Sequence, residues 1–324
     1  MRTKKKSNKR IIRKELKRMR RRKKILEMFI VIIIAGAGIM IYGNSQKNSV
    51  PVSDEHYEHY TYDDFEDETF EDKVNKEDLQ SVQVENINNT DKFENVDITN
   101  DNKGVPVLCY HSVGYDESGT SPLIISPEKF REHMKGLKEN GYTTLTMADL
   151  LKYLINNKPI PVKSVVITFD DGYKDNYINA FPILKEFGMT ATIFVVSDLI
   201  NGETSMTDSE IKEMSDYGID IESHTVSHNR LSEMSYSDQL YELSQSKLEI
   251  EKITGKHVIA AAYPEGKYND DTKTAVREAG YEMGFTIEHG YADRNDDLCM
   301  LNRVCIDYTF SWSNVNYILN NIEK

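Results

Sequence analysis

Residues 164–172 read Ser-Val-Val-Ile-Thr-Phe-Asp-Asp-Gly, an apolar run that ends in two adjacent carboxylates. The run is short and rich in β-branched residues, which is typical of a buried strand. A second strand-like run, Gly218 to Glu222, is followed by two histidines four residues apart, His224 and His228. Two histidines and one aspartate form a ligand set for a divalent metal that leaves one coordination position open. The other aspartate can take a proton from water, so the two motifs predict a metal-dependent hydrolase.

From residue 105 onward, short apolar runs alternate with amphipathic segments that carry helix-capping signals. This alternation implies parallel strands, arranged as a barrel or an open sheet. In both arrangements the functional groups gather at the carboxyl ends of the strands, which is where the Asp170-Asp171 pair, His224 and His111 fall. Strands are expected at 105–110, 164–169, 191–196, 218–222, 257–262, 282–287 and 303–306, and helices at 127–140, 146–156, 175–187, 207–217, 237–254, 270–279 and 313–323.

The amino-terminal segment divides into a basic tail and an apolar run. Residues 1–24 contain 15 Lys or Arg and one acid, and residues 25–42 carry a single charge, Glu27. At 1.5 Å per residue a helix over 25–42 covers roughly 27 Å, enough to cross a hydrocarbon core. Because a basic flank stays in the cytoplasm, we expect a single-pass cell-membrane protein whose remaining chain is extracellular.

Two other interpretations of this segment stay open. A cleaved signal peptide also has a basic front and an apolar middle, and Ala35-Gly36-Ala37 resembles a cleavage site. A basic tail can also bind nucleic acid. We favour an uncleaved signal anchor, because the basic region is long for a signal peptide and the apolar run continues past the Ala-Gly-Ala site.

The composition changes again after the apolar run. Residues 43–104 hold 17 Asp or Glu against 5 Lys and few aliphatic residues, which predicts a disordered linker. Residues 105–324 are long enough for a single domain with a substantial core. The formal net charge is −13, although the tail is basic, so the remainder of the chain is strongly acidic. An acidic exterior argues against a nucleic-acid partner and suits a neutral or cationic polymer.

Three cysteines, Cys109, Cys299 and Cys305, are too few for a disulfide framework. Cys109 lies in an expected strand and is interpreted as a core residue. A Cys299–Cys305 bridge is conceivable outside the cell, but free or buried thiols are the favoured interpretation.

The two motifs and the strand–helix repeat resemble the polysaccharide deacetylases of the NodB-homology, family-four carbohydrate esterase type. The resemblance covers residues 104–310, with residues 168–172 (Thr-Phe-Asp-Asp-Gly) as the first motif and residues 224–228 (His-Thr-Val-Ser-His) as the second. It implies a distorted (β/α) barrel of about seven strands and a hydrolase that removes acetyl groups from a polysaccharide.

The resemblance also implies roles for the motif residues. Asp171, His224 and His228 would bind a divalent metal, zinc in the first place and otherwise cobalt or nickel, and Asp170 would be the general base. The general acid of many members lies in a carboxyl-terminal Leu-x-His motif, for which this chain offers only His289. The Tyr110-His111 pair resembles instead the permuted branch that includes the poly-N-acetylglucosamine deacetylases of biofilm systems, so His111 is assigned as the acid, with His289 as the alternative.

Further site residues follow from their neighbours in sequence. Tyr173 can present its backbone N–H to a developing oxyanion, because Gly172 allows a sharp turn before it. The family's third motif has an Arg that orients the base, and Arg303 could replace it by pairing with Asp170. Tyr263, Pro264 and Trp312 are predicted to line the substrate groove, with a core position for Trp312 left open.

The expected function is N-deacetylation of an N-acetylglucosamine polymer, either secreted poly-N-acetylglucosamine or cell-wall peptidoglycan. Two alternatives remain: an O-acetyl esterase acting on a wall or plant polysaccharide, and a non-catalytic glycan-binding protein on the same fold.

Overall fold

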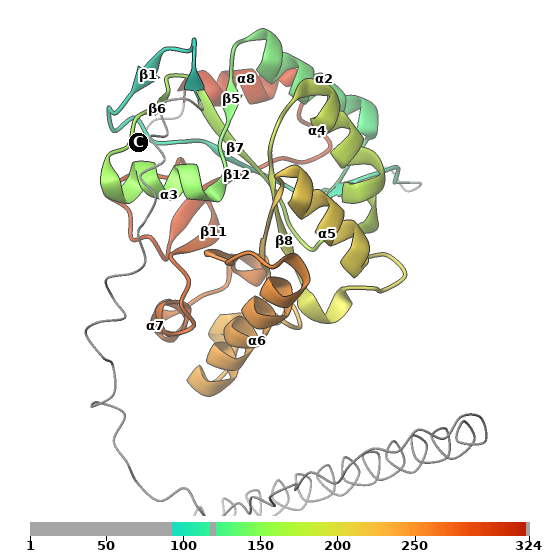
Figure 1. Cartoon of the computed structure of the whole chain (residues 1–324), viewed down its shortest axis with the longest axis vertical. Helices are drawn as coiled ribbons and strands as arrows, with labels where there is room; N and C mark the ends of the chain where they lie inside the picture. Colours follow the sequence, from blue (N-terminus) through green and yellow to red (C-terminus); the bar gives the residue numbers. More distant parts are fainter. Residues whose placement is uncertain (1–92, 117–120, 322–324) are drawn as a thin grey trace, which may run out of the picture. The chain divides into compact units, whose positions relative to one another are not determined.

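The computed structural model describes residues 93–116 and 121–321, and within these ranges seven parallel strands close into a barrel (Figure 1). The strand order is β2-β12-β11-β10-β9-β8-β7, and pairing of β7 with β2 completes the ring. The expected alternation therefore forms a barrel and not an open sheet. The barrel strands are β2 (Val107–Tyr110), β7 (Ser164–Phe169), β8 (Thr192–Val195), β9 (Asp220–Ser223), β10 (Ala260–Ala262), β11 (Met283–His289) and β12 (Leu301–Cys305). Outside the ring, β5 (Thr143–Thr144) pairs with the start of β7.

Helices surround the barrel (Figure 1), and several of them begin at a side-chain cap. Ser126 caps α2, and capping boxes open α3 at Thr146 and α5 at Thr207. The α-helices are α2 (Pro127–Glu139), α3 (Met147–Asn156), α4 (Phe181–Phe187), α5 (Asp208–Tyr217), α6 (Tyr236–Thr254), α7 (Asp270–Glu278) and α8 (Trp312–Asn321). The short elements are β1 (Ile98–Thr99), β3 (Ser112–Val113), β4 (Ile124–Ile125), β6 (Ile160–Pro161), η4 (Ser197–Leu199), η5 (Leu231–Glu233) and η6 (Pro264–Gly266).

The helix expected over 175–187 consists of two pieces. A π-helical turn, η3 (Asn176–Ala180), runs into α4. Pro182, in the first turn of α4, has no backbone N–H to donate to the preceding turn. We attribute the wider turn to this missing bond, because π-turns form where the i→i−4 ladder is interrupted.

The strands separate two apolar clusters. Alternate residues such as Leu108 and Ile167 pack outward against the helices, whereas Val107 and Val166 belong to a second cluster with side chains of α3. Towards the carboxyl ends of the strands, the residues in phase with the second cluster become polar, including Thr168, Asp170 and Arg303, all of which are buried. The barrel therefore has an apolar base and a polar carboxyl end.

The domain begins earlier than residue 105. Strand β1 pairs antiparallel with β6, and the Tyr153 hydroxyl donates to the carbonyl of Asp101 at 2.8 Å. The predicted linker boundary at 104 is therefore wrong, because residues 93–104 pack onto the domain. The basic tail and the predicted anchor over 25–42 lie outside the described residues. Among the residues described, none of the helices has both the length and the apolar character that a membrane span requires.

All three cysteines are free thiols: Cys109 and Cys299 are buried, and Cys305 is exposed. The possible Cys299–Cys305 bridge is absent. Strand β12 runs between the two residues in extended form, which keeps them apart.

Candidate metal centre and active site

Asp171, His224 and His228 come together at the carboxyl end of the barrel. Asp171 follows β7 with a φ of 70°, and Gly172 continues the turn with a φ of 71°. A Cβ at Gly172 would lie 2.9 Å from the Val195 side chain, so the turn requires glycine. The two histidines follow β9, the second strand along the barrel from β7.

The histidine loop is held by a buried carboxylate. Glu242 of α6 accepts hydrogen bonds from the backbone N–H groups of Val226 (3.0 Å) and Ser227 (2.8 Å), and from the Ser227 hydroxyl (2.6 Å). Thr225 and His228 both adopt positive φ values, 69° and 57°, so this loop needs outside support to keep its shape. Sequence analysis missed Glu242, although it lies on the buried stripe of α6 with Gln239, Leu243 and Ser246.

The three side chains are arranged as metal ligands. The Oδ1 atom of Asp171 lies 3.5 Å from Nε2 of His224 and 3.2 Å from Nε2 of His228. Nδ1 of His224 lies 2.8 Å from the carbonyl oxygen of Ala262. A carbonyl only accepts, so Nδ1 carries the proton and the Nε2 lone pair faces Asp171. Such an outer hydrogen bond is typical of a metal-binding histidine.

The donor set fits a divalent metal. One ligand atom from each of the three side chains lies within 4.8 Å of the others, and two imidazoles with a carboxylate suit zinc or a similar ion. Burial lowers the pKa of His224, which favours the neutral imidazole that a metal needs. The hydrogen bond to Asp171 raises the pKa of His228.

Asp170 lies in a different environment from its neighbour. It is 2% exposed, and Arg303 of β12 binds both of its oxygens, with Nη1–Oδ1 at 2.7 Å and Nη2–Oδ2 at 2.8 Å. Arg303 is fully buried and also donates from Nε to the carbonyl of Thr286 at 2.8 Å. Burial alone would raise the pKa of Asp170, but the charge and hydrogen bonds of Arg303 hold it below its usual range. The predicted pairing of Arg303 with Asp170 is confirmed.

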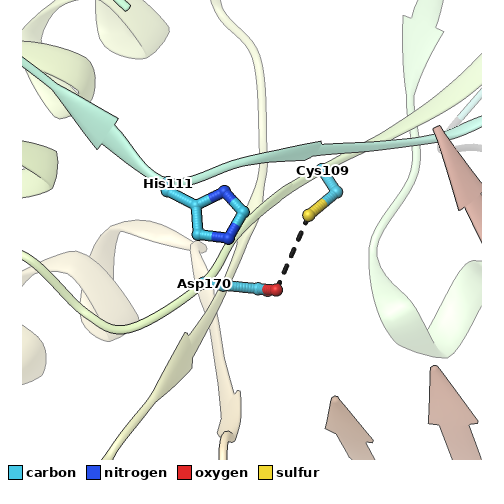
Figure 2. A group of neighbouring side chains, drawn as sticks. All are labelled: Cys109, His111 and Asp170. Carbon is cyan, nitrogen blue, oxygen red and sulfur yellow. Dashed lines mark hydrogen bonds between the residues drawn. The ribbon is translucent and has the colours of Figure 1, made fainter. Parts of the chain in front are cut away.

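His111 lies beside Asp170. Figure 2 shows the side chains of Cys109, His111 and Asp170 turned toward one another. Cys109 and His111 come from the carboxyl end of β2, and Asp170 follows β7. The loop after His111 is anchored by Asp175, which accepts from the Ser112 hydroxyl (2.5 Å) and the Val113 N–H (3.1 Å). His289 is exposed at the end of β11 and is not part of this cluster. The structure therefore brings His111, and not His289, to the predicted base.

Tyr173 takes part in an isolated bridge with Ser205. The hydrogen bonds of this bridge come from the residues on either side of the pair. The N–H of Lys174 donates to the carbonyl of Thr204, and the N–H of Met206 donates to the carbonyl of Gly172. The N–H of Tyr173 itself points away from the bridge, and within the described residues no acceptor receives it. This geometry is compatible with the predicted oxyanion contact.

The predicted groove residues need correction. Tyr263 is fully buried, and its hydroxyl donates to the carbonyl of Cys299 at 2.7 Å. Pro264 is buried as well. Neither side chain lines an open groove. Trp312 packs on α2, where a Cβ at Gly136 would lie 2.1 Å from the indole, so the structure supports the alternative packing role for this residue.

Comparison with known proteins agrees with this architecture. A family model described as polysaccharide deacetylase matches residues 157–284. A Bacillus subtilis protein described as a polysaccharide deacetylase, YxkH, is 40% identical over 209 residues, which cover 64% of this chain and 74% of that protein. The poly-β-1,6-N-acetyl-D-glucosamine N-deacetylase of Staphylococcus aureus is 30% identical over 196 residues, covering 56% of this chain and 67% of that protein.

A solved structure, the Streptococcus pyogenes deacetylase PplD in complex with acetate, matches with a TM-score of 0.65 and 32% identity. The match covers 69% of this chain and 100% of that one. The barrel, the two motifs at its carboxyl end and these relatives agree: the chain belongs to the polysaccharide deacetylase family and is a hydrolase.

Proposed function

We propose that this chain is a membrane-anchored, extracellular N-deacetylase that removes acetyl groups from an N-acetylglucosamine polymer, with zinc as its metal. The observation that carries the proposal is the pair of adjacent aspartates with separate partners. Asp171 faces two histidines, and Asp170 is held by Arg303 beside His111. This arrangement keeps a metal-binding group and a proton-accepting group next to each other.

The chemistry follows from these positions. A divalent metal held by Asp171, His224 and His228 would supply a Lewis acid that polarises the acetyl carbonyl and acidifies water. The lowered pKa of Asp170 favours its ionised form, and its Oδ1 keeps a lone pair that Arg303 does not use, so this oxygen can accept the proton of an attacking water. The Tyr173 N–H can donate to the oxygen on which negative charge develops. His111 would then protonate the departing nitrogen.

The substrate proposal rests on the Staphylococcus aureus relative, whose name states that it acts on poly-β-1,6-N-acetyl-D-glucosamine. The acetate bound to the Streptococcus pyogenes deacetylase agrees with acetate as a product. The extracellular location rests on the basic tail and the apolar run at 25–42. Protease treatment of intact cells tests it: the domain should be degraded while the amino-terminal tail survives, and a fully protected domain would contradict it.

The activity is tested by measuring acetate release from β-1,6-linked N-acetylglucosamine oligomers by the full-length protein, with and without zinc. Peptidoglycan and acetylated xylan run alongside, and Asp170→Asn is the inactive control. We expect zinc-dependent acetate from the oligomers and none from the control. Acetate from xylan alone would identify an O-acetyl esterase, and glycan binding without acetate from any substrate would identify a binding protein.

A further inference from the structure

A second group of potential metal ligands adjoins the first. The Sγ of Cys109, a ring nitrogen of His111 and a carboxylate oxygen of Asp170 all lie within 4.8 Å of one another. Figure 2 shows the three side chains converging, with the Cys109 sulfur facing the carboxylate. The Sγ–Oδ2 distance is 3.5 Å. An ion that replaces the thiol proton between these two atoms would meet both of them.

The donor atoms favour a particular class of ion. One sulfur, one imidazole nitrogen and one carboxylate oxygen form a mixed set that suits zinc and softer ions, not Mg²⁺ or Ca²⁺. The guanidinium of Arg303, on strand β12, already neutralises the negative charge of Asp170. The additional negative charge that attracts a cation must therefore come from the cysteine as a thiolate, which selects a thiophilic ion.

The site can be reached from solvent. Cys109 is fully buried, but His111 is only partly covered, and Cys305, the partner of Cys109 on β12, is exposed. An ion that arrives at the carboxyl end of the barrel therefore meets the partly covered His111 before it reaches the buried thiol.

We propose that Cys109, His111 and Asp170 form a second, inhibitory cation site that takes a thiophilic divalent ion such as Zn²⁺ in excess or Cd²⁺. Binding forms a metal–sulfur bond, and the thiol proton leaves to water. The ion occupies the two groups that the proposed mechanism uses to move protons, so turnover stops. The inhibition rests on the proposed function, whereas the binding does not.

Cobalt titration separates the two sites. The metal-free, full-length protein is titrated with Co²⁺, because only a cobalt–thiolate bond gives a strong near-ultraviolet charge-transfer band. The Asp171–His224–His228 site contains no sulfur, so its filling should leave that region unchanged. We expect the charge-transfer band to appear with the second equivalent in the wild type and to be lost in Cys109→Ser. Cys299→Ser, which removes a buried thiol elsewhere, is the matched control and should keep the band.

The first-equivalent spectrum and circular dichroism report whether Cys109→Ser is folded, and His111→Ala provides a second variant that keeps the thiol while weakening the band. No band in the wild type, or a band that persists in Cys109→Ser, would overturn the proposal. A band lost only in Cys305→Ser would also overturn it, since the sulfur ligand would then be the exposed thiol.

Inhibition is measured on each variant relative to its own rate with one metal equivalent. Excess Zn²⁺ should inhibit the wild type and Cys299→Ser. In Cys109→Ser the inhibition constant should be about 10- to 100-fold higher than in the wild type. Equal inhibition of the wild type and Cys109→Ser would contradict the proposal. Should the protein release no acetate at all, the proposed function fails and the cobalt titration still decides whether the second site exists.

Discussion

Asp170 and Asp171 are neighbours in sequence, yet the structure places them in two different regions. Asp170 faces the interior of the barrel, is 2% exposed and is bound through both oxygens by Arg303. Asp171 adopts a left-handed backbone conformation at the rim and faces two histidines. The negative charge in the interior is balanced permanently by an arginine. In the part of the chain that the structure describes, no lysine or arginine pairs with Asp171, so a removable cation suits the ligands at the rim.

The difference between the two aspartates predicts that loss of a metal ligand at the rim lowers activity more than any other substitution. His224→Ala removes a ligand whose position is set by the Ala262 carbonyl. The variant should lose its metal, and activity should fall by roughly 10³-fold or more, because a catalytic metal supplies several kcal/mol of transition-state stabilisation. Metal content and acetate release check this. His257→Ala, at an exposed histidine outside the site, is the control, and a His224→Ala protein that retains its metal would refute the ligand assignment.

Removal of the positive charge of Arg303 should lower the stability of the protein as well as its activity. Arg303→Met leaves Asp170 as a buried carboxyl without its partner, which costs about 3–5 kcal/mol if the charge is kept. Burial then raises the pKa of Asp170, so the acid limb of the pH–rate profile should move to higher pH. Denaturant unfolding and kcat/KM as a function of pH measure the two effects.

The sign of the pH dependence follows from the depressed pKa of Asp170 in the folded state. The stabilisation from the pair is present above the unfolded pKa and is lost as pH falls toward the folded value. The stability difference between wild type and Arg303→Met should therefore shrink in acid. Arg277→Met, at an exposed ion pair with Asp297, is the control and should change stability by about 1 kcal/mol or less. An unchanged pH profile in Arg303→Met would contradict the role of Arg303.

His111 tests whether the interior region also supplies the acid. His111→Asn should lower the rate on an N-acetyl substrate by at least about 10²-fold, the size of a general-acid contribution. An aryl acetate has a leaving group that needs no proton, so its hydrolysis should fall much less. The ratio of the two losses is the measurement. Equal losses on both substrates would assign His111 a structural role, and His289→Asn is the control for the alternative acid.

The smallest expected effect comes from the support of the rim. Glu242→Ala removes the carboxylate that accepts from the N–H groups of Val226 and Ser227. Metal affinity should fall by about 10- to 100-fold, as for other groups that orient metal ligands. Competition with a chelator measures the affinity. Glu249→Ala, on the exposed face of the same helix, is the control. Equal metal affinities of the two variants would show that Glu242 does not support the metal ligands.

Much of the barrel could be predicted because the period of apolar residues and the helix-capping residues are local features of the sequence. Strand β7 occupies the expected residues 164–169, and the capping box at Thr207 marks the start of α5. The pair Asp171 and His224 was predictable for the same reason, since both residues end strands.

The corrections concern contacts between distant segments. Tyr263 is buried because Gly284 leaves room for it: a Cβ there would lie 2.0 Å from the Tyr263 hydroxyl. The packing of residues 93–104 depends on pairing with Ile160 and Pro161. Neither contact has a local sequence signal. Glu242 had a weak one, an acid on an otherwise buried helical stripe.

The central claim, that the two aspartates have separate tasks, is tested most directly by measuring metal content and acetate release in Asp170→Asn and Asp171→Asn side by side. The account predicts that Asp170→Asn binds metal as the wild type does and releases no acetate, whereas Asp171→Asn loses both the metal and the activity. An active Asp170→Asn enzyme, or an Asp171→Asn protein that retains its metal, would contradict it.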